Sequence, residues 1–210
     1  MNDINDFQIY NKLKEIISLK KTIINSCLDI GCGINPTLNW FKKVFNSTNF
    51  LCVEPDLEIF KRLKDLNIKC IKDLNETNEL FDLVIAKEVF EHINKEDCIS
   101  FLKKCKKQTN KIFAMTVPNF ENWNENLKSV DIELRFVPDH FSFFKPTSQN
   151  FHDHKLYLTP EILENYLKQV FNDEWDIQIF RAWPWEIKDM ARIRKFNLYF
   201  KIFAIIIKKD

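Results

Sequence analysis

Short apolar runs alternate with helix-period segments through the first 120 residues of the chain. Read as strands, the runs are 27–30, 50–53, 68–71, 81–86 and 112–117. Apolar positions recur at helical spacing between and before them, in the segments 6–24, 35–45, 56–66 and 94–107. Strands that alternate with helices at this spacing predict a parallel sheet covered by helices on both faces.

The pattern changes after the fifth strand. Residues 118–158 are rich in Asn, Phe and His and have no clear period. This segment is too long for a simple connector and is typical of a segment that faces a substrate. Thr159-Pro160-Glu161 then opens a helix, and strands are expected at 175–181 and 200–208. No boundary or repeat divides the chain, so residues 1–210 are expected to form a single domain.

Composition narrows the class of protein. The 210 residues are 45% hydrophobic with a net charge of +1, which excludes disorder and weakens the case for a nucleic-acid or membrane-surface protein. The six cysteines form no C-x-x-C pair and are interpreted as reduced core residues of a cytoplasmic protein. The most apolar stretch, 196–207, contains Lys201 and is too short to insert into a membrane.

Glycine is the unusual residue. The chain contains only Gly31 and Gly33, whereas average usage would give about 15. Both fall where the first strand ends and a helix is expected to follow. A turn of this kind aims backbone N–H groups and a helix N-terminus at a ligand beside the carboxyl edge of the sheet.

Two ligand classes fit the turn, a dinucleotide and S-adenosylmethionine (SAM). The dinucleotide fingerprint needs a third glycine where this chain has Pro36, and the carboxylate of Asp29 would repel a pyrophosphate. The same carboxylate favours the ammonium and sulfonium groups of SAM. Glu54 ends the next strand, where an acid can accept both ribose hydroxyls, and Asp73-Leu74 can place a carboxylate near an adenine amino group.

With these motifs, residues 26–118 resemble the class I SAM-dependent methyltransferases. The resemblance is carried by L-D-I-G-C-G, V-E-P-D and F-D-L-V-I-A, followed by E-V-F-E-H-I. It implies a Rossmann-like α/β fold with a seven-stranded, mostly parallel sheet, helices on both faces and an antiparallel last strand. It also implies cofactor contacts by Asp29, Gly31, Gly33, Glu54, Asp73 and Leu74.

The segment after the fourth strand separates the methyltransferase subclasses. It lacks the Asn/Asp-Pro-Pro-aromatic box of adenine-amino enzymes and the Pro-linked cysteine of cytosine enzymes, so DNA is not expected as a substrate. It carries Glu88-x-x-Glu91-His92 instead. In a helical turn these positions share one face and could converge on a cation, although a solvated first turn explains the same residues.

Glu-Val-x-Glu-His resembles the cation-binding segment of two branches, the ubiquinone-pathway O-methyltransferases and the small-RNA 3′-terminal ribose 2′-O-methyltransferases. Asp153-His154-Lys155 before Thr159 resembles a further part of the RNA branch, whereas Leu156-Tyr157-Leu158 departs from it. The resemblance implies an Mg²⁺ or Mn²⁺ held by Glu88, Glu91, His92 and His154.

Transfer of the activated methyl group of SAM to a hydroxyl also needs a base or a metal. The candidate catalytic residues are His154, His92 and His140, in that order. The sequence favours O-methylation of a small-molecule acceptor such as a sugar, phenol or quinone precursor. Ribose 2′-O-methylation at an RNA 3′ end is the alternative enzyme, and a non-catalytic SAM-binding partner subunit is the alternative from another class. Nothing in the sequence indicates an oligomeric state.

Overall fold

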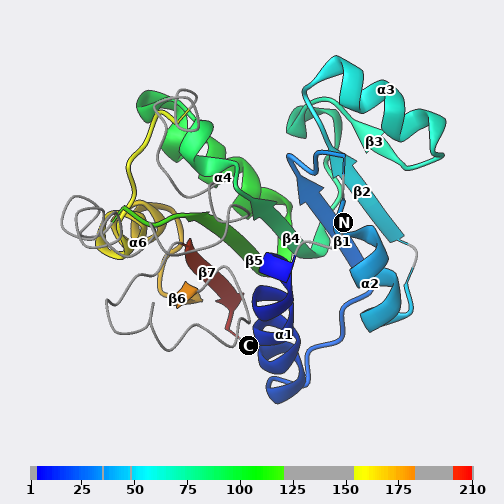
Figure 1. Cartoon of the computed structure of the whole chain (residues 1–210). Coiled ribbons are helices and arrows are strands. Elements are labelled where there is room, and N and C mark those ends of the chain that lie inside the picture. Colours follow the sequence, from blue (N-terminus) through cyan, green and yellow to red (C-terminus); the bar gives the residue numbers. More distant parts are fainter. Residues whose placement is uncertain (1–3, 35, 48, 121–153, 183–200, 210) are drawn as a thin grey trace, which may run out of the picture.

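A computed structural model describes residues 4–34, 36–47, 49–120, 154–182 and 201–209, with side chains described from residue 10 onward. Its centre is one seven-stranded sheet in the order β3-β2-β1-β4-β5-β7-β6 (Figure 1). The strands are β1 Ser26–Ile30, β2 Asn49–Val53, β3 Cys70–Ile71, β4 Phe81–Lys87, β5 Thr109–Pro118, β6 Trp175–Ala182 and β7 Lys201–Lys208.

The pairing of the strands confirms the predicted fold class. β1 to β5 run parallel to one another, whereas β7 pairs antiparallel with both β5 and β6. The chain adds β2 and β3 on one side of β1, and then crosses to β4 and β5 on the other side. Ligands of such sheets bind beside the carboxyl ends of the strands, where the strand order reverses, which here is between β1 and β4.

Helices pack on both faces of the sheet. Side chains of α1 (Ile4–Leu19), α2 (Leu38–Phe45) and α3 (Leu57–Asp65) join one core cluster, and those of α4 (Cys98–Gln108) and α6 (Pro160–Val170) join the other. The separation follows from the central strands β1 and β4, which are buried at every residue except Lys87 and therefore supply apolar side chains to both layers.

The helix ends show which local predictions hold. Asp56 caps α3 as expected, because its carboxylate accepts hydrogen bonds from the N–H groups of Glu58 and Ile59. α2 starts later than predicted, at Leu38, and Thr37 stands at its N-cap position. Asn35, the expected cap, lies outside the described residues.

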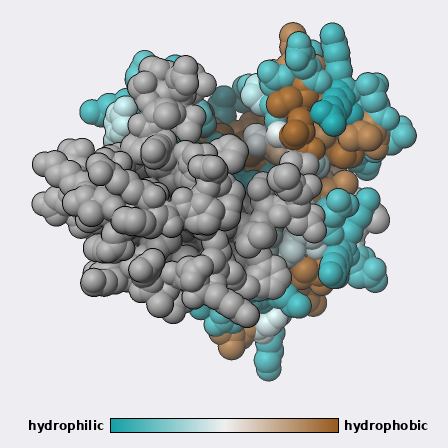
Figure 2. Space-filling view, in the orientation of Figure 1, coloured by the Kyte–Doolittle hydropathy of each residue, from teal (hydrophilic) through white to brown (hydrophobic). Residues whose placement is uncertain are grey.

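All six cysteines are buried and unpaired, in agreement with their interpretation as core thiols. Among the residues that the structure describes, no helix is long and apolar enough to cross a membrane. On the face seen in Figure 2, hydrophobic residues gather among hydrophilic ones over the end of the molecule that carries α3. Leu57 and Leu66, at the two ends of that helix, are 55% and 60% exposed.

Candidate active site

The two glycines form the turn that leaves β1. Both have left-handed backbone, with φ +62° at Gly31 and +60° at Gly33, which only glycine adopts without strain. The N–H of Gly31 donates to the carbonyl of Val53 at 2.8 Å and that of Cys32 donates to the same oxygen at 3.3 Å. The turn is therefore fastened to the carboxyl end of β2.

Two buried carboxylates hold this turn in place. Thr37 donates its N–H and its hydroxyl to Oδ2 of Asp29, at 2.7 and 2.6 Å. Gly33 donates its N–H to Oε2 of Glu54 at 2.8 Å, and Asp56 donates its N–H to Oε1 at 3.0 Å. Asp29 and Glu54 are only 2% and 5% exposed. Each carboxylate oxygen has a second lone pair, so Glu54 can still accept a ligand hydroxyl.

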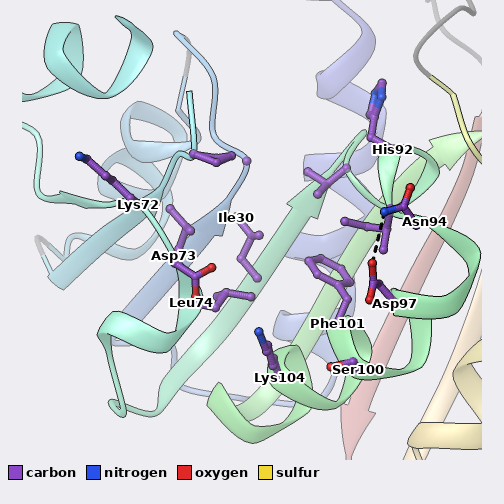
Figure 3. Close-up of a pocket in the computed structure, with 15 residues that line it drawn as sticks. Ile30, Lys72, Asp73, Leu74, His92, Asn94, Asp97, Ser100, Phe101 and Lys104 are labelled. Atoms are coloured by element: carbon purple, nitrogen blue, oxygen red, sulfur yellow. Dashed lines mark hydrogen bonds between the residues drawn. The ribbon is translucent and has the colours of Figure 1, made fainter. Parts of the chain in front are cut away.

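A cavity of about 360 Å³ opens beside the turn. It runs from the carboxyl ends of β1, β2 and β3 to α4, and Figure 3 shows Asp73 and Leu74 on one side and Phe101 of α4 on the other. Of the predicted cofactor residues, Gly31, Asp73 and Leu74 line this cavity. Asp29, Gly33 and Glu54 are not among its lining residues; they lie next to it and support the turn through their hydrogen bonds, and Glu54 keeps lone pairs for a ligand.

Val89 also lines the cavity, although its residue type gave no sign of a site. A Cβ atom built on Gly31 would lie 2.5 Å from Cγ2 of Val89, which is closer than two non-bonded carbon atoms can approach. Gly31 is therefore needed for space as well as for its backbone conformation. The sequence shows only that Val89 is a β-branched residue shortly after the fourth strand. Its contact with the glycine turn becomes visible only in the fold.

Three of the four residues expected to hold a metal converge. Ligand atoms of Glu91, His92 and His154 all lie within 4.8 Å of one another, and the two imidazole rings are 4.9 Å apart between centroids. His154 reaches the other two because the N–H groups of Lys155 and Leu156 both donate to the carbonyl of Glu91, at 2.8 and 3.1 Å. This backbone contact joins segments that are far apart in the sequence.

Glu91 is the buried member of the group. It is 1% exposed, and neither of its carboxylate oxygens meets a hydrogen-bond donor in the part of the chain that the structure describes. Burial, reinforced by the negative charge of Glu88, raises the pKa of Glu91 to about 8. A buried carboxylate beside two imidazoles fits a divalent metal, which would supply the missing partner.

Glu88 does not join this group, and the reason is the local backbone. The predicted helical turn over 88–92 is reduced to a single 3₁₀ turn, Phe90–His92. Glu88 precedes it with φ +53°, and its N–H donates to the carbonyl of Thr116 at 3.0 Å. Its side chain forms an ion pair with Lys201 of β7, with Nζ and Oε2 3.4 Å apart. Sequence analysis did not assign Lys201 to the site.

The remaining predicted site residue is His140, which lies outside the described residues, as does most of the 118–158 segment. The described ends of that segment place two aromatic rings near the three-residue group. Phe120 packs edge-on against His154, at 6.2 Å, and against Tyr157, at 5.0 Å between ring centroids. Tyr157 is 62% exposed, whereas its neighbours Leu156 and Leu158 are buried.

Comparison with known proteins rests on structure alone, because no protein-family model matches the sequence and no curated protein resembles it closely enough to be recognised. The plantazolicin methyltransferase BpumL, in complex with a pentazolic desmethylPZN analog and SAH, has a TM-score of 0.72 at 16% identity. That match covers 100% of this chain and 86% of the other.

Two further structures agree with it. Magnesium protoporphyrin IX methyltransferase (ChlM) from Synechocystis PCC 6803, with bound SAH, has a TM-score of 0.59 at 10% identity over 99% of this chain and 85% of its own. A SAM-dependent methyltransferase from Archaeoglobus fulgidus has a TM-score of 0.57 at 17% identity, covering 95% and 94% of the two chains. The chain therefore has the class I methyltransferase fold that its motifs predicted.

Proposed function

We propose that the protein is a SAM-dependent methyltransferase. The observation that carries the proposal is the cavity beside the glycine turn, because it lies at the carboxyl edge where the strand order reverses and is lined by Gly31, Asp73 and Leu74. Similar structures hold SAH, the demethylated form of SAM, which supports the same cofactor here. Glu54 accepts the ribose hydroxyls, and Asp73 and Leu74 bind the adenine.

The acceptor is a hydroxyl oxygen of a small molecule, and a divalent cation such as Mg²⁺ or Mn²⁺ assists the reaction. Glu91, His92 and His154 would hold the ion, which lowers the pKa of a bound hydroxyl. His92 supports this placement because it belongs to the three-residue group and also lines the cavity (Figure 3). The acceptor oxygen would therefore be activated beside the cofactor.

The chain's own residues mainly position the reactants. The sulfonium methyl group of SAM is already activated, so catalysis requires the acceptor oxygen to lie in line with the methyl–sulfur bond and water to be excluded. Gly31 allows the cofactor to approach the end of β1, and the exposed ring of Tyr157 offers a wall for the acceptor beside His154. The related structures are named for plantazolicin and a magnesium porphyrin, which supports an acceptor other than nucleic acid.

Calorimetric titration tests the cofactor. The wild-type protein should bind SAM, and Glu54→Gln should bind it at least about tenfold more weakly, a loss of ~1.4 kcal/mol. Glu58→Gln, an exposed change on α3 with the same chemistry, should bind normally. Failure of the wild-type protein to bind SAM would refute the methyltransferase proposal.

A labelled-methyl assay tests the acceptor and the metal. Label should enter small molecules of a cell extract, chelation should stop the transfer, and Mn²⁺ or Mg²⁺ should restore it. Glu91→Gln should abolish the metal-dependent transfer, whereas the exposed Glu96→Gln should not. Transfer that is insensitive to chelators would rule out the metal. Label that enters RNA 3′ ends instead would favour the alternative of a ribose 2′-O-methyltransferase. SAM binding without any methyl transfer would favour the alternative of a non-catalytic partner subunit.

A further inference from the structure

Glu88 occupies a strained and well-fixed position at the end of β4. Its φ of +53° belongs to the left-handed region, which costs a residue with a side chain about 1–2 kcal/mol. Its N–H is held by both the carbonyl and the hydroxyl of Thr116 on β5, at 3.0 and 3.3 Å. Strain of this kind persists where the surrounding structure imposes it, and such positions cluster at functional sites.

The two carboxylate oxygens of Glu88 have different surroundings. Its Oε2 is 3.4 Å from Nζ of Lys201, and the two side chains are 30% and 20% exposed. Its Oε1 is buried and has no hydrogen-bond donor among the described residues. The charge of Glu88 also acts on the neighbouring Glu91, as does the positive charge of Lys201. Glu88 and Lys201 therefore belong to the electrostatic surroundings of the candidate metal group.

We propose that Lys201 competes with the bound metal ion for the carboxylate of Glu88. When the ion pair between Lys201 and Glu88 opens, Glu88 becomes a fourth protein ligand of the ion. The inference rests on the metal centre proposed above and assigns Lys201 as a positioning residue that sets the affinity of that centre.

The chemistry of the groups favours this exchange. Glu91, His92 and His154 supply three ligands, whereas Mg²⁺ and Mn²⁺ prefer six, so a further carboxylate can be accommodated. Lys201 carries one positive charge on a flexible, partly exposed side chain, and its ammonium can return to water. A dication attracts the carboxylate of Glu88 more strongly than an ammonium does. Opening the ion pair with Lys201 nevertheless costs free energy, and this cost weakens metal binding.

Mn²⁺ titration followed by electron paramagnetic resonance, on proteins without added SAM, tests the competition. Lys201→Gln should tighten Mn²⁺ binding at least about tenfold, because it removes the competitor as well as a repelling charge. In a Glu88→Gln background the same change should tighten binding by less than about threefold, since only the repelling charge is then removed. Lys201→Arg, which keeps the ion pair, should bind as the wild-type protein does.

Lys208→Gln is the matched control, because it removes the same charge from the exposed far end of β7 and should leave Mn²⁺ affinity unchanged. Substituting Co²⁺ gives a second readout, since its visible absorption should differ between Lys201→Gln and the double variant if Glu88 coordinates the ion. Equal effects of Lys201→Gln in the two backgrounds, with wild-type Mn²⁺ binding intact, would overturn the competition alone. Absence of Mn²⁺ binding in every protein would refute the metal centre itself.

Discussion

The two glycines have almost the same backbone but different surroundings. An added Cβ at Gly31 would meet Val89 at 2.5 Å, whereas one at Gly33 would meet nothing within 4 Å. Gly33→Ala should therefore cost only the left-handed backbone, about 1–2 kcal/mol of the free energy of unfolding. Gly31→Ala should cost about 1–3 kcal/mol more, because Val89 must move.

Urea unfolding of the two variants measures this difference, and Val89→Ala provides the control. In the Val89→Ala background, Gly31→Ala should lose most of its extra cost, since the space is then free. An equal loss of stability for Gly31→Ala with and without Val89 would contradict the steric explanation.

At the residue scale, the sequence singled out residues whose type indicates a chemistry, and it did not single out residues whose importance depends on contacts. Glycine, acids at strand ends and histidines stand out in the printed sequence, so Gly31, Asp73 and His92 were predicted before their positions were known. Val89 lies between Glu88 and Phe90, and Lys201 begins a strand; neither residue type indicates a site by itself. Only the pairing of β5 with β7 brings Lys201 to Glu88, and no local pattern contains that information.

Asp82 shows how one side chain joins several strands at the amino edge of the sheet. Its carboxylate accepts hydrogen bonds from the N–H of Asn25, before β1, and from the side chain of Asn110 on β5, both at 2.9 Å. It also forms an ion pair with Lys111 at 3.0 Å. Burial alone would raise the pKa of Asp82, but these hydrogen bonds and the lysine charge outweigh it and lower the pKa below its usual value.

The lowered pKa predicts a dependence of stability on pH. A carboxyl whose pKa is depressed by folding stabilises the protein above its unfolded pKa of about 3.9, and this contribution is lost as pH falls through the lower folded pKa. Asp82→Asn should reduce the free energy of unfolding near neutral pH by about 1–3 kcal/mol. The difference from the wild-type protein should shrink in acid. Urea unfolding at several pH values, with the exposed Asp173→Asn as control, measures it; a difference that stays constant below the unfolded pKa would contradict the assignment.

At the element scale, long apolar runs predicted strands well and cap residues predicted helix starts less well. The first strand was expected at 27–30 and is observed at Ser26–Ile30, because Cys27, Leu28 and Ile30 supply apolar side chains to a strand that is buried on both faces. α2 begins three residues after its expected cap, since Thr37 donates to Asp29 and keeps the preceding loop out of the helix. The turn at 88–92 is not α-helical and keeps only the 3₁₀ turn Phe90–His92, because Glu88 is tied to Thr116 across the sheet. These are tertiary contacts, which override local propensity.

At the scale of the whole molecule, SAM binding should raise the melting temperature Tm, because the bound cofactor would contact the ends of β1, β2 and β3 as well as α4. A ligand present at a hundred times its Kd adds about 2.7 kcal/mol to the free energy of unfolding, and for a chain of this size that raises Tm by about 5–11 °C. Scanning calorimetry with and without SAM measures the shift. Glu54→Gln at the same SAM concentration should show a smaller shift, and an unchanged wild-type Tm would contradict binding at this site.

The place of β7 has a consequence for how the chain folds during synthesis. Of the strands that the structure describes, β7 is the last in the sequence, yet it lies between β5 and β6 and pairs with both. A nascent chain can assemble β1 to β5 early, but β5 then presents an unpaired edge until Lys201–Lys208 has been made. Exposed edges of this kind recruit other strands, so the growing polypeptide is most prone to aggregation just before its sheet closes. The same strand carries Lys201, so Glu88 acquires its counter-charge only after β1 to β6 have been made.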